Sequence, residues 1–223
     1  MATFVIVHGA WTGAWSWKRV VERLRAKGHV VHVPTLSGLG ERTHLNTLPI
    51  NLTTHIDDVV NEILFHDLGN VVLVAHSYGG IVGTGVIERV KDRIASVVYL
   101  EAFIPEDGQG FIDFVGGWEL KGELIEAPPT SPGDYLREED RAWVDGKATP
   151  QPTATLTERL KVAGAYKDLA KKTYIVATGW DGFSTIADTY RNDPAWQVHE
   201  VACGHDVPID MPDELTALLE KAA

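Results

Sequence analysis

The sequence predicts an α/β fold: a mostly parallel sheet of about six strands flanked by helices, with a small helical cap inserted after the fourth strand. Short runs rich in Val and Ile lack the polar alternation of half-exposed strands, which indicates strands buried on both faces, as in parallel sheets. All of these runs except the last are separated from the next by enough chain for a helical crossover. The predicted strands are residues 3–7, 30–33, 71–74, 95–100, 173–177 and 197–201.

Four segments between and after these runs carry the apolar spacing of amphipathic helices. The first has apolar residues at i, i+3, i+4 and i+7 within residues 17–24 and is expected to stop at Gly28. The second is expected behind a cap formed by Thr54 and Asp57. A third pattern directly follows the third strand, and the last follows Pro212.

The segment 105–172 interrupts this alternation. It contains several prolines, has no strong buried-strand pattern and mixes helical stretches with aromatic residues. We predict one domain, in which residues 1–104 and 173–223 form the core and residues 105–172 form a cap over a pocket. Trp118 of the cap and Trp11 of the first loop are the expected pocket residues. Other aromatic residues that could line it, or form the cap's own core, are Phe111, Phe114, Tyr135 and Trp143.

Charge and composition limit the expected partners. The 20 Lys and Arg residues are outnumbered by 31 Asp and Glu residues, which gives a formal net charge of -11, and no basic run occurs. Nucleic acid and membranes are therefore not expected partners, and no apolar stretch approaches the roughly 20 residues that span a bilayer. The length of 223 residues suits a single domain, acting as a monomer or a homodimer. A single cysteine, Cys203, and an N-terminus without a signal-peptide pattern predict a cytoplasmic protein.

Ser77 lies at the point where an apolar strand must turn sharply into a helix. Such a turn strains the backbone, and only small residues two positions before and two positions after allow it; here these are Ala75 and Gly79. The turn would hold the hydroxyl clear of the sheet at the start of the following helix. This arrangement predicts a nucleophile elbow.

A serine hydroxyl is a weak nucleophile, so it needs a base within hydrogen-bond reach. His205 follows the last strand and a glycine, which places it at the same edge of the sheet as Ser77. We predict that His205 is this base. Of the other histidines, His76 is expected to point away from Ser77, His8 to shape the first loop, and His55 to have no role.

Two acidic residues are candidates for orienting the imidazole. Asp181 follows the fifth strand, where hydrolases with this chain order commonly place the acid, but Asp followed by Gly is also ordinary turn chemistry. Glu101 ends an apolar strand, where burial of an unpaired carboxylate would be costly, so it needs a partner such as His205. We favour Glu101 and keep Asp181 as the alternative.

A tetrahedral intermediate needs two N–H donors for its oxyanion, one from the residue after the nucleophile and one from the loop after the first strand. These would be Tyr78 and Ala10. The loop 8–15 is glycine-containing but lacks both common nucleotide-binding patterns, and no His, Cys or Asp cluster has metal-ligand spacing. No cofactor and no metal ion is therefore expected.

The chain resembles the α/β-hydrolase superfamily, in particular the small esterase group that includes plant methylesterases, hydroxynitrile lyases and bacterial carbendazim hydrolases. The segments that carry the resemblance are residues 7–17, 75–80 and 204–205. The lyases have a Thr and a Lys where this sequence has Ala10 and Asp206, so the resemblance disfavours cyanohydrin cleavage. The strand-end Glu101 is similar to the acid of certain haloalkane dehalogenases, although these use an Asp nucleophile.

The resemblance implies a cofactor-free serine hydrolase that cleaves a small, largely apolar carboxylic ester through an acyl-enzyme, with a carbamate or an amide as further candidate substrates. Two alternatives stay open. One is a receptor-like protein that binds a ligand on this fold with negligible turnover. The other is a lyase that uses the same histidine and oxyanion site.

Overall fold

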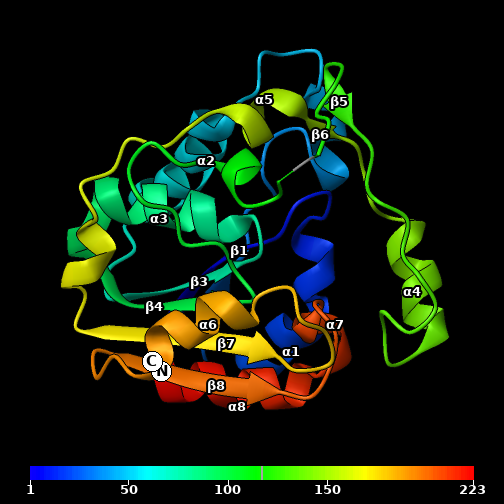
Figure 1. The fold of residues 1–223 in the computed structure, drawn as a ribbon. Coiled ribbons are helices and arrows are strands. Elements are labelled where there is room, and N and C mark those ends of the chain that lie inside the picture. Colours follow the sequence, from blue (N-terminus) through cyan, green and yellow to red (C-terminus); the bar gives the residue numbers. More distant parts are fainter. Residues whose placement is uncertain (117) are drawn as a thin grey trace.

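The computed structural model describes residues 1–116 and 118–223, which fold around one six-stranded parallel sheet (Figure 1). The order of strands is β2-β1-β3-β4-β7-β8, and every pairing between them is parallel. All six predicted strands are confirmed. Their bounds are β1 (Thr3–Val7), β2 (Val30–His32), β3 (Val71–His76), β4 (Ile94–Leu100), β7 (Lys171–Ala177) and β8 (Trp196–Val201).

Helices cover both faces of the sheet, and each face has its own apolar core. One core lies between the sheet and α2 (Leu52–Phe65), α3 (Gly79–Val90) and α6 (Ser184–Arg191). The other lies between the sheet and α1 (Lys18–Ala26) and α8 (Pro212–Ala222). This double cover explains why the central strands are apolar on both faces and show no alternation. Among the described helices, none combines the length and apolar character needed to cross a bilayer.

The cap of α2 differs from the prediction. The helix begins at Leu52, and Asn51 Oδ1 accepts a hydrogen bond of 2.9 Å from Thr54 N, while Thr54 Oγ1 accepts one of 3.3 Å from Asn51 N. Thr54 therefore occupies the third helical position rather than the cap, because Asn is the stronger capping residue. Asp57 pairs with Arg89 of α3 instead.

The segment 105–172 contains two very short antiparallel strands, β5 and β6, as well as the helix α4. Strands of two residues leave no periodic pattern in a sequence, so they were not predicted. In Figure 1 the arrowheads of β7 and β8 point toward the side on which α4 lies. The bounds in this segment are η4 (Phe111–Asp113), β5 (Leu124–Ile125), α4 (Glu138–Asp145), β6 (Gln151–Pro152), α5 (Thr153–Thr157) and η5 (Ala165–Asp168). The remaining short elements of the core are η1 (Ala14–Trp17), η2 (Gly40–Leu45), η3 (Lys91–Arg93) and α7 (Val207–Asp210).

The register of the sheet brings several chain turns to one edge. Val7 of β1 pairs with Ala75 of β3, and Ala75 pairs with Tyr99 of β4. The residues that directly follow these strands therefore emerge side by side at the carboxyl edge. This edge is where ligands bind in open parallel sheets.

Candidate active site

Ser77 forms the turn between β3 and α3 with a φ of 55°, in the left-handed region that non-glycine residues rarely adopt. A side chain at Gly79 would place its Cβ 2.6 Å from the carbonyl oxygen of Val7, and one at Gly80 would lie 2.1 Å from that of Phe103. Glycine is therefore required at both positions for α3 to start this close to the sheet. The backbone has the conformation predicted for a nucleophile elbow.

His205 lies in the loop after β8 and lines the same cavity as Ser77. Its ring stacks on Phe183 with a centroid distance of 5.3 Å and an interplanar angle of 7°. The ring of His76 lies 4.8 Å away, so the expectation that His76 turns away from the site is wrong. Within the described residues, no hydrogen bond joins Ser77 Oγ to the imidazole; such catalytic contacts often tighten only when substrate binds.

His76 contacts the backbone of the loop that carries His205. Its Nε2 lies 3.1 Å from the backbone oxygen of His205, and burial lowers the pKa of His76 to about 3. The ring is therefore neutral at physiological pH, and its Nε2–H donates to that carbonyl. This contact fixes the backbone that carries His205.

Glu101 is fully buried, and its carboxylate contacts three donors. Oε1 accepts a hydrogen bond of 2.6 Å from Ala177 N, and Oε2 accepts one of 2.6 Å from Trp180 Nε1. Oε2 also lies 3.3 Å from His205 Nδ1. Three converging donors compensate for burial of the carboxylate. A hydrogen bond from His205 Nδ1 to this carboxylate would leave Nε2 of the neutral ring without a proton.

Asp181, the alternative acid, lines neither of the two cavities that His205 lines. Its side chain is exposed, and Oδ1 accepts a hydrogen bond from the hydroxyl of Ser184 at the start of α6. This is the turn role that Asp followed by Gly also allowed. Of the two acids, the structure brings Glu101 to His205 and leaves Asp181 in a turn.

The two backbone amides predicted to face an oxyanion are those of Ala10 and Tyr78. Within residues 1–116 and 118–223, neither N–H donates a hydrogen bond, so both stay available to a ligand. The preceding carbonyl of Gly9 accepts from His8 Nδ1 at 2.8 Å and from Thr12 Oγ1 at 3.1 Å. Because N–H and C=O point in opposite directions in a trans peptide, these contacts turn the Ala10 N–H away from them. Burial lowers the pKa of His8 to about 4 and keeps this ring neutral.

The side chain of Tyr78 points into the core rather than into the site. Its hydroxyl lies 2.9 Å from His55 Nδ1, and His55 Nε2 lies 2.8 Å from the backbone oxygen of Ser37. Burial lowers the pKa of His55 to about 3. His55 therefore makes a buried contact with the Tyr78 hydroxyl, although the sequence analysis expected no role for it. No local pattern signals this pair, because its two residues lie 23 positions apart.

Ser77 and His205 both line a cavity of about 170 Å³, and His205 also lines a second cavity of about 350 Å³. Trp11 lines the first cavity, as predicted. Trp118 lines neither: it is 44% exposed and packs against Trp11 with a centroid distance of 6.0 Å. The residues that line both cavities are Pro128, Thr130, Tyr135, His205 and Asp206.

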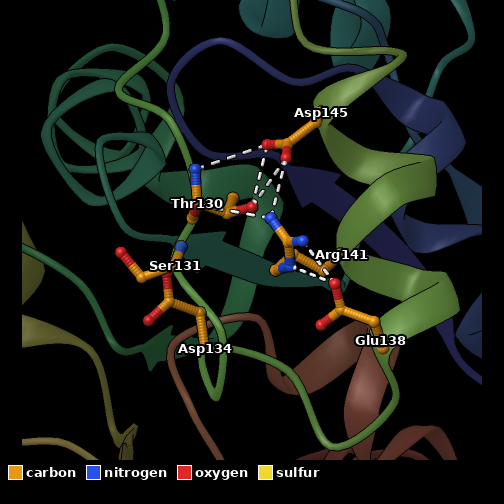
Figure 2. Close-up of polar contacts among 6 residues, drawn as sticks. All are labelled: Thr130, Ser131, Asp134, Glu138, Arg141 and Asp145. Atoms are coloured by element: carbon orange, nitrogen blue, oxygen red, sulfur yellow. Dashed lines mark hydrogen bonds and ion pairs between the residues drawn. The ribbon is translucent and has the colours of Figure 1, made fainter.

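The first three of these shared residues belong to the 105–172 segment, and polar contacts fix their position. Figure 2 shows Thr130 beside α4, where its hydroxyl and backbone N–H donate to Asp145 and Arg141 contacts Asp145 and Glu138. The hydroxyl of Tyr135 donates to Asp206, the neighbour of His205. Sequence reasoning missed Thr130, Asp145 and Asp206, because nothing in their spacing signals a contact between segments.

The parallel sheet and the site at its carboxyl edge are those of an α/β hydrolase, and comparison with known proteins agrees. The chain belongs to the α/β hydrolase family, whose sequence model matches residues 4–218. The carbendazim hydrolyzing esterase of Nocardioides sp. is 39% identical over 98% of this chain and 98% of its own. Methylesterase 1 of Arabidopsis thaliana is 35% identical over 46% of this chain and 40% of its own.

Solved structures agree with the sequence comparison. An extracellular α/β-hydrolase from a Paenibacillus species, described as homologous to tobacco salicylic acid binding protein 2, superposes with a TM-score of 0.87. It is 26% identical, and the match covers 100% of this chain and 99% of the other. The Arabidopsis methylesterase MES16 shares the fold, with a TM-score of 0.80 at 23% identity over 100% of this chain and 98% of its own. The resemblance drawn from the sequence is confirmed, and the chain is a carboxylic-ester hydrolase of the α/β-hydrolase type.

Proposed function

We propose that this esterase cleaves a small, largely apolar carboxylic ester, carbamate or amide through an acyl-enzyme on Ser77, without a cofactor. One observation carries the proposal. Ser77 and His205 line one cavity, while the buried carboxylate of Glu101 lies 3.3 Å from His205 Nδ1. A nucleophile, a base and an orienting acid in this relation are the parts of a hydrolytic triad.

In this proposal His205 Nε2 takes the proton of the Ser77 hydroxyl as Oγ attacks the carbonyl carbon of the substrate. The oxyanion that forms accepts hydrogen bonds from the free N–H groups of Ala10 and Tyr78. His205 then passes the proton to the leaving alkoxide or amine as the bond to it breaks. A water molecule, activated by His205, hydrolyses the ester of Ser77 and restores the hydroxyl. Glu101 keeps the imidazole in the required tautomer and stabilises its charged form.

The lining of the cavities favours an uncharged substrate, or a cationic one, over an anionic one. Asp145 and Asp206 line the first cavity and Asp134 and Asp206 the second. In the described part of the chain no Lys or Arg lines either cavity. A carboxylate on the substrate would meet like charges without a partner.

The 105–172 segment is proposed to act as the cap of the site. Support comes from Thr130, Tyr135 and Asp145, which it contributes to the cavity lining. A volume of about 170 Å³ beside Ser77 admits only a small group there, so the larger part of a substrate would occupy the 350 Å³ cavity. The cap would then decide which esters reach Ser77.

The proposal is tested by a screen of methyl, short-chain, aromatic and carbamate esters, each in neutral, cationic and carboxylate-bearing forms, with wild-type protein and Ser77→Ala in parallel. We expect neutral and cationic esters to be hydrolysed with kcat/KM at least tenfold above their carboxylate analogues. Ser77→Ala should lower kcat by a factor of about 10⁴ or more, because no acyl-enzyme can form.

Ser184→Ala is the matched control, since this serine lies on α6 and bonds to Asp181 outside the proposed machinery. It should retain activity within about threefold, as expected for a surface change. Unchanged ester turnover by Ser77→Ala would refute the acyl-enzyme. Turnover of none of the esters by the wild-type protein, despite labelling of Ser77, would favour the ligand-binding alternative.

A further inference from the structure

A second cluster of chemically reactive side chains lies outside the hydrolytic site. His32 ends β2, Glu62 lies on α2 and His66 directly follows α2, and these three residues bring one ligand atom each within 4.8 Å of one another. None of the three lines the cavities beside Ser77 and His205. The cluster is therefore separate from the proposed hydrolytic site.

The distances within the cluster suit a metal ion. His32 Nδ1 lies 2.7 Å from Glu62 Oε1, and His66 Nε2 lies 3.6 Å from the same oxygen. In a tetrahedral zinc site with bonds of about 2.1 Å, ligand atoms are separated by about 3.4 Å. The observed separations lie on either side of this value. Small side-chain rotations would bring all three atoms to the ion.

The backbone holds the ligands from two elements. Glu62 lies in the last turn of α2, and His66, four residues later, is the C-cap residue that ends the helix, so the two side chains lie close together. The side chains of His32 and Glu62 are 18% and 25% exposed, which limits their freedom before any ion binds. That of His66 is 57% exposed, so water can reach the position opposite the protein ligands. His32 and Glu62 are 30 positions apart, and for this reason spacing in the sequence did not predict the cluster.

The charge around the cluster is compatible with a cation. Within the described residues, the ion-pair partners of Glu62 are the two histidines alone. Arg25 lines the adjoining groove with His32 and Glu62, but its guanidinium donates to the backbone oxygen of Val31 at 2.8 Å. The carboxylate of Glu62 therefore has no competing Lys or Arg partner.

We propose that His32, Glu62 and His66 bind a divalent transition-metal ion, with water completing a tetrahedral site. Two imidazoles and one carboxylate suit zinc and its neighbours copper, nickel and cobalt better than magnesium or calcium. The ion would tie the edge strand β2 to the end of α2 and stabilise the folded state, because the unfolded chain offers no such site. It takes no part in the proposed hydrolysis.

The test is isothermal titration of the full chain, without an affinity tag and after dialysis against chelator, with zinc chloride. We expect one ion per chain, because the cluster offers a single set of three ligands. Addition of zinc should raise Tm, and cobalt chloride should give the visible absorption of a tetrahedral site. His66→Ala and Glu62→Gln should each weaken binding at least tenfold.

His44→Ala is the matched control, because His44 is an exposed histidine outside the cluster whose Nδ1 lies 3.3 Å from the backbone oxygen of Glu41. His44→Ala and His205→Ala should both bind zinc as the wild type does. Exposed His66 can be replaced without loss of the fold, so its variant stays informative. Binding weaker than about 1 mM in the wild type, or unchanged binding by His66→Ala and Glu62→Gln, would overturn the site. Loss of binding in His205→Ala would place the ion at the hydrolytic site and overturn it equally.

Discussion

Glu101 combines a φ of 44° with a carboxylate that has no solvent exposure. Both features are costly for a non-glycine residue. The cost is offset because Ala177 N, Trp180 Nε1 and His205 Nδ1 all converge on its two oxygens. A residue held so unfavourably, with one side turned to a histidine, fits a role in orienting that histidine.

Replacement of each acid by its amide separates their roles. Glu101→Gln should lower kcat by a factor of about 10³ to 10⁴, because the amide no longer fixes the tautomer or stabilises the charged imidazole. Asp181→Asn should change kcat by less than about threefold, since its side chain is exposed. Ester hydrolysis is measured with both purified variants, and circular dichroism verifies that they are folded.

A larger loss in Asp181→Asn than in Glu101→Gln would contradict this assignment. The pH profile of kcat is a second readout. A purely structural Glu101 would lower Tm without changing the shape of that profile.

At the scale of single residues, the sequence predicted which side chains could lie close together. It did not predict all of the residues that hold these side chains in place. Ser77, His205 and Glu101 were predicted because each lies at or shortly after the end of a predicted strand, and parallel strands end at one edge. His55, Thr130 and Asp145 contact their partners across separate loops and helices, and no local pattern encodes such contacts. The choice between Glu101 and Asp181 as the acid depended on the path of the loop after β7. No local sequence pattern predicts that path.

At the scale of elements, the buried carboxylate of Asp140 links α4 to the core. Asp140 Oδ2 accepts hydrogen bonds of 2.9 Å from Arg19 Nη1 and 2.8 Å from Arg137 Nε. Arg19 also donates to the backbone oxygen of Ile209 at 2.6 Å. Hydrogen bonding from Arg19 lowers the pKa of Asp140, despite its burial. This stabilisation is present above the unfolded pKa of Asp, about 3.9, and is lost as pH falls below it.

We expect Asp140→Asn to loosen α4. A broken pair with a buried carboxylate costs several kcal/mol, and partial exposure of both arginines reduces this to about 2 kcal/mol. For a chain of this length the change lowers Tm by about 4–8 °C. Differential scanning calorimetry gives the Tm, and limited proteolysis should show faster cleavage within residues 126–148.

Glu139→Gln serves as the control, because the pair of Glu139 with Arg137 has a carboxylate that is 75% exposed. Its Tm should fall by less than about 2 °C. Equal decreases in Tm in the two variants would mean that Asp140 stabilises the fold no more than an exposed ion pair does.

The six strands of the large sheet and the longer helices were predictable, and the short elements, including α4 and α6, were not. The central strand β3 is buried along its whole length and is an almost continuous apolar run, whereas the edge strand β8 is partly exposed and carries polar residues. In the 105–172 segment, β5 and β6 have two residues each and are defined by pairing between Leu124 and Pro152 and between Ile125 and Gln151. Such pairing depends on tertiary contacts, for example the hydrogen bond of 3.0 Å from Trp11 Nε1 to the Ile125 carbonyl.

At the scale of the whole molecule, three neutral histidines are buried in the fold. Burial lowers the pKa values of His8, His55 and His76 to about 4, 3 and 3. In the unfolded chain each would return to about 6.5. The unfolded state therefore binds up to three more protons than the folded state between about pH 6 and pH 4.5, and stability must fall as pH falls through this window.

The free energy of unfolding should drop by about 4 kcal/mol between pH 7.5 and pH 5.5, since each of three histidines contributes about 1.4 kcal/mol per pH unit below 6.5. Urea unfolding at a series of pH values measures this slope. A free energy that stays constant down to pH 5.5 would show that these rings are protonated in the folded protein.

The proposed mechanism requires that Ser77 is the residue that forms the covalent intermediate. The most direct measurement is titration with a fluorophosphonate, followed by intact-mass and peptide mass spectrometry and by the residual rate of ester hydrolysis. We predict one adduct per chain, located on the peptide that contains Ser77, with activity lost in proportion to the fraction labelled. Full labelling with activity retained, or an adduct on another residue that accounts for the loss, would contradict the mechanism.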